Sequence, residues 1–152
     1  MKQVHGRGGA RRKQRGVGLI EVLVSVVVAG IGLLGAAALQ ASALRNNQGA
    51  YERTQTTILT QDIFDAMRAN LAGVITGAYN SGGWVCSAPT NASLASSDVG
   101  RWIVNLQRQI NSSACGQIAC TAARDCTVQV RWDDSRATDG DSAQTLALRA
   151  QL

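Results

Sequence analysis

The sequence has a single histidine and a single proline among its 152 residues. The histidine, His5, lies in the first sixteen residues, so the rest of the chain has no imidazole. Imidazole is the commonest general base and the commonest metal ligand in proteins. No nucleophile stands beside a base elsewhere in the chain. The residue types therefore indicate a protein that is not an enzyme and needs neither a metal nor another cofactor.

Acidic residues are absent from the first sixteen positions, which carry six of the fifteen lysines and arginines. These six are Lys2, Arg7, Arg11, Arg12, Lys13 and Arg15. Over the rest of the chain nine bases face ten acids, a net charge of −1. A nucleic-acid-binding subunit, such as one for DNA uptake, needs a basic patch on its folded part as well. We therefore expect no nucleic-acid partner.

The four cysteines all lie in the C-terminal half, at Cys86, Cys115, Cys120 and Cys126. An even number of cysteines in a small domain outside the cytoplasm is typical of disulfides. The spacings C-x4-C-x5-C lack the short C-x2-C pairs of zinc sites, and no histidine completes a mixed set of ligands. A redox or metal enzyme is thus the weaker interpretation. Three pairings of the four cysteines are possible.

Residues 17–39, VGLIEVLVSVVVAGIGLLGAAAL, form an apolar run of 23 residues with one charge. About 20 apolar residues suffice for a helix to cross a bilayer. Basic residues crowd the run's N-terminal side and are scarce after it. This asymmetry predicts that the N-terminus stays in the cytoplasm and the C-terminal part crosses the membrane.

Three interpretations compete for this run. A cleaved signal peptide has a shorter apolar core followed by small residues, which residues 35–38 would imitate. A plain signal anchor fits the length but leaves Glu21 and the end of the basic stretch at Gly16 without a reason. A leader that is cut before the run would leave the run in the mature protein.

The third interpretation matches a known pattern. Residues 15–24, RGVGLIEVLV, resemble the start of the type IV pilins and pseudopilins, in which a basic leader ends in glycine and the fifth mature residue is glutamate. The resemblance implies that prepilin peptidase cuts between Gly16 and Val17 and methylates the new N-terminus at Val17. The family usually begins with Phe and then Thr or Ser, and Val17 and Gly18 depart from that.

Glu21 is a carboxylate inside an apolar run, and such residues normally have a partner and a function. The resemblance implies that this residue pairs with the positively charged N-terminus of a neighbouring subunit during assembly. Such a pair sets the register of adjacent helices, because a shifted neighbour leaves a buried charge unpaired. The alternative is that Glu21 reaches the cytoplasmic interface of the membrane.

After residue 39 the sequence remains compatible with a helix to about residue 72, with apolar residues recurring at three- and four-residue steps. Loop signals occupy residues 73–97, and a short helix is predicted over 96–110, with Asp98 as its N-cap or first-turn acid. A cysteine loop is expected over 112–126. Alternation predicts strands over 126–132 and 143–152. The intervening turn carries four acids, but it lacks the full spacing of a calcium-binding EF-hand loop.

Together these elements predict an α+β, type IV pilin-like fold: a long N-terminal helix packed against a small antiparallel head. The segments are a cleaved leader (1–16), a membrane-spanning or filament-core helix (17–39), its amphipathic continuation (40–72) and a disulfide-containing head (73–152).

Residues 61–80 and 128–136 are similar to stretches of minor pilins of the PilV type, the pilus modification proteins. The resemblance implies a minor pilin that acts in pilus assembly or initiation, with effects on motility and adhesion. Its partners would be prepilin peptidase, other pilins and the inner membrane, and its final location the pilus or cell surface. The nearest alternative is a minor pseudopilin of a type II secretion system.

Overall fold

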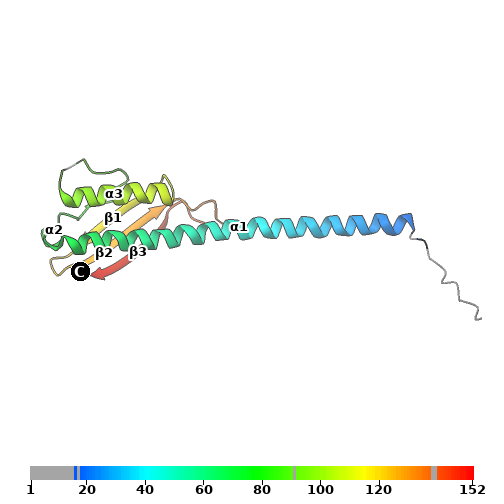
Figure 1. Cartoon of the computed structure of the whole chain (residues 1–152), viewed down its shortest axis with the longest axis horizontal. Coiled ribbons are helices and arrows are strands. Elements are labelled where there is room, and N and C mark those ends of the chain that lie inside the picture. The colour runs from blue at the N-terminus through cyan, green and yellow to red at the C-terminus, as the bar shows by residue number, and fades with distance from the viewer. Residues whose placement is uncertain (1–15, 17, 91, 138–139) are drawn as a thin grey trace, which may run out of the picture. The chain divides into compact units, whose positions relative to one another are not determined.

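The computed structural model describes residues 16, 18–90, 92–137 and 140–152. The chain divides into two compact units, one that ends at Gln40 and one that comprises Ala41–Leu152. Three helices precede three strands along the chain (Figure 1). The architecture is α+β, with a long apolar N-terminal helix and a small antiparallel sheet, as the sequence predicts.

Helix α1 spans Leu19–Ala69 and contributes to both units. In the first unit its large apolar side chains are exposed. In the second unit it has a buried stripe at three- and four-residue steps, which is the spacing of one helix face. The stripe consists of Gly49, Glu52, Thr56, Leu59, Thr60, Ile63, Phe64 and Met67. Thr56 and Thr60 are satisfied within the helix, since each hydroxyl donates to the carbonyl four residues earlier.

Two shorter helices follow. Helix α2, Leu71–Ile75, begins after Asn70, whose side chain accepts a hydrogen bond from the Gly73 amide. Helix α3 spans Leu94–Gln109, and its N-cap is Ser93, which accepts from the Ser96 amide. The prediction of Asp98 as the N-cap or a first-turn acid is therefore wrong, because Asp98 lies inside the helix, beyond its first turn. Its buried carboxylate accepts from the Tyr79 hydroxyl at 2.7 Å and from Arg101 at 2.6 Å.

The sheet has the order β1-β2-β3, with both pairs antiparallel. Its strands are β1 at Cys115–Cys120, β2 at Asp125–Trp132 and β3 at Gln144–Gln151. The two predicted strands are confirmed as β2 and β3. The loop expected over 112–126 is wrong, because it contains β1.

Gly116 of β1 packs closely against Trp102 of α3. Two ring carbons of Trp102 lie 2.3 Å from where a Cβ at position 116 would be, so only glycine fits there.

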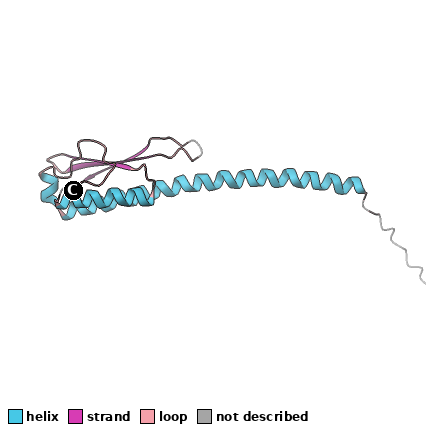
Figure 2. Ribbon diagram, turned by 90° about the horizontal axis from the view of Figure 1, so that it is seen from above, coloured by secondary structure: helices cyan, strands magenta, loops and turns pink. Residues whose placement is uncertain are grey.

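The sheet forms one layer of the second unit, and α3 with the later part of α1 forms the other (Figure 2). Strand β2 is central and buries alternate residues. The core lies between the layers, where Phe64 and Met67 of α1 and Ile103 and Leu106 of α3 join the buried face of β2, including Trp132.

Two disulfides lie in this second unit. Cys86 is joined to Cys115, and Cys120 is joined to Cys126. The second bond connects directly opposite residues of β1 and β2. The first ties the segment before α3 to the start of β1. No described cysteine is free.

Candidate functional site

The start of α1 is the first candidate site. Gly18 precedes the helix, and its carbonyl accepts hydrogen bonds from the amides of Glu21 and Val22 at 3.0 and 3.3 Å. Glu21 thus lies in the first turn, where the positive end of the helix dipole favours an anion. Gly16 is exposed, and no atom lies within 4 Å of where its Cβ would be. Val17, the predicted first mature and methylated residue, lies outside the described residues.

The large apolar side chains before and after Glu21 are exposed in the first unit. Leu19 is 91% exposed and Leu34 is 74% exposed. The segment is long and apolar enough to cross a membrane by length and composition. Gly30, Gly32 and Gly35 have open space around their Cβ positions, so another helix can approach the backbone closely there. Water does not stabilise such a surface, which favours a bilayer or neighbouring helices around it.

Glu21 itself has no salt-bridge partner among the described residues, and its side chain is exposed. Its hydrogen bonds involve only its backbone, since the amide donates to the Gly18 carbonyl at 3.0 Å and the carbonyl accepts from the Ser25 hydroxyl at 2.6 Å. The carboxylate can therefore accept a cation from outside its own chain. Within an apolar environment, a positive group next to it would be strongly favoured over a neutral one.

The predicted disulfide cysteines do not belong to this site, because all four lie in the second unit. Their sulfurs are paired with one another, and the described residues bring together no group of three or more His, Cys, Asp or Glu side chains suited to a metal. In the acidic turn, hydrogen bonds from Ser135 and the field of Arg136 lower the pKa of the Asp133 carboxyl. Asp139 of the same turn lies outside the described residues.

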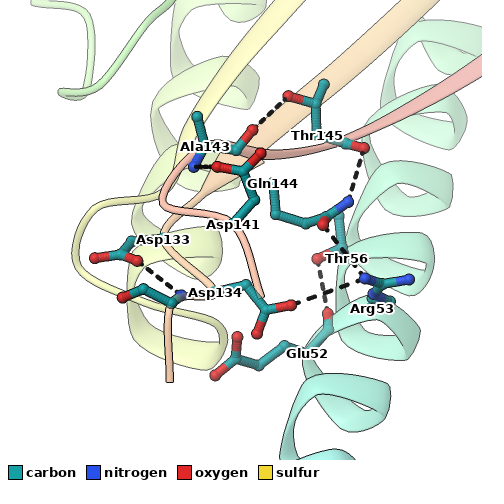
Figure 3. Close-up of polar contacts among 10 residues, drawn as sticks. Glu52, Arg53, Thr56, Asp133, Asp134, Asp141, Ala143, Gln144 and Thr145 are labelled. Atoms are coloured by element: carbon teal, nitrogen blue, oxygen red, sulfur yellow. Dashed lines mark hydrogen bonds and ion pairs between the residues drawn. The ribbon is translucent and has the colours of Figure 1, made fainter. Parts of the chain in front are cut away.

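A second charged cluster, which the sequence analysis missed, lies between α1 and the turn after β2 (Figure 3). Glu52 of α1 is 7% exposed and Asp134 is 4% exposed. The Oε2 atom of Glu52 has no hydrogen-bond partner among the described residues. Arg53 Nη2 lies 3.9 Å from Asp134 Oδ2 and 3.3 Å from the Gln144 side-chain oxygen. The sequence signal for Glu52 is its helical spacing from apolar residues, since it lies seven positions before Leu59 and eleven before Ile63 and so shares their helix face.

Burial raises the pKa of the Glu52 carboxyl above its usual value, and the nearby Asp134 carboxylate raises it further. Arg136 and Trp132 oppose these two effects. Glu52 is therefore stable in its protonated, neutral form over a wider pH range than an exposed glutamate. The cluster joins the turn to α1, and its arrangement contains no nucleophile next to a base.

Residues 11–37 match the family model of the prokaryotic N-terminal methylation motif. This match covers the last part of the basic stretch, from Arg11, together with Gly16, Glu21 and most of the apolar run. It supports a place for the chain in the superfamily of type IV pilins and pseudopilins, whose leader is the substrate signal for prepilin peptidase. No curated protein and no solved structure matches the chain.

Proposed function

We propose that the chain is a minor pilin of the PilV type, made as a precursor and incorporated into a type IV pilus, where it acts in assembly or initiation. One observation carries the proposal: the methylation motif over residues 11–37 coincides with an exposed apolar helix that has a carboxylate in its first turn. The helix holds the precursor in the inner membrane with the head in the periplasm.

Prepilin peptidase cuts after Gly16 and methylates Val17. Gly16 supports this role because it is exposed and lacks a side chain that would hinder a peptidase. The cut removes all six leader bases and leaves the apolar helix at the new N-terminus.

Assembly then pairs Glu21 with the new α-amino group of a neighbouring subunit. The carboxylate lies four residues from that terminus, in the first turn of the helix, and has no salt-bridge partner among the described residues. Once two helices lie side by side in an apolar environment, an unpaired charge is costly, so only the register that brings the charges together is stable.

The mass and N-terminus of the protein from host membranes test the processing step. Both lysines, Lys2 and Lys13, lie in the leader, so the mature chain has a single amine, at Val17. We expect the loss of residues 1–16 and, in an amine-labelling assay, one modified site per chain. An intact N-terminus indicates a plain signal anchor, and a cut near Ala38 indicates a soluble periplasmic protein. Either result overturns the proposal.

Matched variants sharpen this test. Gly16→Leu places a bulky side chain at the cut and should leave the precursor uncut. Gly30→Leu makes the same change within the apolar helix, away from the cut, and should be processed as the natural protein is. Equal processing of the two variants contradicts the role of Gly16.

Zero-length cross-linking tests the pairing of Glu21. A carbodiimide joins carboxylates to amines, and the only amine of the mature chain is its N-terminus. We expect a cross-link between Glu21 and the α-amino group of the neighbouring subunit. Glu21→Gln should abolish it, whereas Asp62→Asn, which removes an exposed carboxylate elsewhere on α1, should leave it unchanged. A cross-link that persists in Glu21→Gln contradicts the pairing.

The alternative is a minor pseudopilin of a type II secretion system, which shares the leader and the apolar helix. Deletion of the gene separates the two functions. A pilus subunit predicts fewer surface pili and reduced motility with normal protein secretion. The reverse phenotype indicates the secretion system.

A further inference from the structure

The two edges of the sheet differ. The outer edge of β1 is covered by the segment before α3, because Val85 and Gly116 exchange two backbone hydrogen bonds of 2.7 and 2.9 Å. Farther along, the Ser81 amide donates to the Ile118 carbonyl at 3.0 Å, and the Cys120 amide donates to the Asn80 side chain at 2.7 Å. This edge therefore has no room for another strand.

The outer edge of β3 is open. Leu152 donates to the carbonyl of Arg124, and the register continues through Cys126↔Ala150. Hydrogen-bonded and non-hydrogen-bonded pairs alternate in an antiparallel ladder, so even-numbered residues of β3 bond to β2. The amides of Ala147, Arg149 and Gln151 point outward instead, and the described residues give them no partner.

Nothing on this edge discourages pairing. Natural proteins protect open edges with lysine, proline, bulges or short strands, but β3 is eight residues long and its only charged residue is Arg149. On the core side, Leu146, Leu148 and Ala150 are only partly buried. An added strand would gain backbone hydrogen bonds from the outward amides and apolar contact with these three side chains.

We propose that β3 is the docking site for an extended segment of a different, co-assembling subunit, which adds to the sheet as a fourth strand. Alternate apolar side chains of that segment would cover the exposed halves of Leu146, Leu148 and Ala150. Main-chain hydrogen bonds would give affinity, and the alternate side chains would give specificity. This inference rests on the proposed function, in which the chain works beside other subunits.

A second copy of this chain does not fit the open edge. The closed edge of β1 excludes a head-to-tail arrangement of β3 on β1. An antiparallel pairing of two β3 strands reverses one copy, and β3 runs in the same sense as the part of α1 in its own unit (Figure 1). The second-unit parts of α1 in the two copies would then be antiparallel, whereas in the proposed function all subunits join the assembly with their helices in the same direction. A parallel, two-fold pairing would place the apolar residues of one β3 on the polar side of the other.

Hydrogen exchange tests this proposal on the full mature chain, compared as the free subunit in detergent and in filaments sheared from host cells. On assembly, the amides of Ala147, Arg149 and Gln151 should exchange about 100-fold more slowly, as newly hydrogen-bonded amides do. The amides of Leu146, Leu148 and Ala150, already bonded to β2, serve as internal controls. Unchanged exchange of the outward amides in filaments overturns the proposal.

A pair of variants at one position adds a second test. Ala147→Pro removes an outward amide while the ladder to β2 keeps all its bonds, so it should block the added strand. Ala147→Thr keeps the amide and suits a strand. We expect at least tenfold less Ala147→Pro than Ala147→Thr in filaments, with similar melting temperatures in detergent. Equal incorporation overturns the proposal, and if Ala147→Pro fails to fold, the exchange experiment decides alone.

Two further outcomes are distinguishable. Protection of the outward amides in the free subunit that grows with the subunit concentration identifies a second copy as the occupant. This result overturns the assignment to a different subunit. Absence of the natural chain from filaments contradicts the proposed function itself. Presence in filaments with unprotected amides contradicts only the role of β3.

Discussion

Glu52 is the buried carboxyl whose proton affinity the fold raises. Its pKa rises above the usual 4.5 because of burial and the nearby Asp134 carboxylate. From about that pH upward to the raised pKa, the folded chain holds a proton at Glu52 that the unfolded chain has lost. Stability falls with pH wherever the folded state binds more protons. The contribution of Glu52 is thus fully present below pH 4.5 and is lost as the pH rises through the raised pKa.

Glu52→Gln should remove this part of the pH dependence, because the amide has nearly the same shape and does not ionise. We expect the free energy of unfolding of the variant to change less between pH 4.5 and neutrality than that of the natural chain. Denaturant titrations over that pH range measure the difference. Asp62→Asn serves as the control, since it removes an exposed carboxylate from the same helix. An identical pH profile for Glu52→Gln and the natural chain contradicts this account.

Gly116→Ala tests the close approach between β1 and α3. A Cβ at this position would meet two ring carbons of Trp102 at 2.3 Å and Ile103 at 3.0 Å. Overpacking of this kind typically costs about 1–3 kcal/mol, and the Trp102 ring is fixed within the core. Gly83→Ala, whose Cβ meets nothing within 4 Å, should change stability by less than about 1 kcal/mol. Thermal or denaturant unfolding of both variants provides the comparison.

At the scale of elements, the two disulfides should differ in what they contribute. Cys86–Cys115 closes a loop with a sequence separation of 29, and Cys120–Cys126 one of 6. Loop-closure entropy gives about 3.6 and 2.2 kcal/mol for loops of these lengths. Replacing the first pair by alanine should therefore destabilise the head by roughly 1.4 kcal/mol more than replacing the second. Denaturant midpoints of the two double variants test the order, and the reverse order contradicts it.

The sequence predicted the elements that have a clear period. The apolar run and the stripe of α1 follow helical spacing, and β2 and β3 alternate, so all were found. Strand β1 was missed because Cys-Gly-Gln-Ile-Ala-Cys has no alternation, and its place depends on pairing with β2 and on room for Trp102. The N-cap of α3 was placed too late because an acid near a helix start resembles a cap, whereas Asp98 is held by Tyr79.

The residues of the candidate sites also fall into two groups, those that a local sequence motif predicts and those that only the fold brings together. The leader motif is a local pattern, so Gly16, Val17 and Glu21 were named from the sequence alone. Glu52 and Asp134 are 82 positions apart in the numbering, and only the packing of the turn on α1 brings them together. The pairing of the cysteines likewise depends on the register of β1 and β2, which no spacing in the sequence reveals.

At the scale of the whole molecule, the core belongs entirely to the second unit. Among the described residues, none before Gly49 is buried. Residues 41–152 should therefore fold without the first forty, because their removal deletes no core side chain. We expect this fragment to be soluble without detergent and to melt within a few degrees of the full chain. Circular dichroism and the retention of both disulfides check the result, and an unfolded fragment contradicts it.

The disulfides also determine how far the head can stretch under tension. A force that enters through α1 and leaves through β3 extends an unfolded chain only between cross-links. At about 3.5 Å per residue, the loops closed by the two disulfides withhold roughly 100 and 20 Å of contour length. On unfolding under force, an oxidised head therefore extends by about 120 Å less than a reduced one. The two disulfides thus limit how far the chain can extend, and the filament of the proposed function would lengthen less before its subunits are fully extended.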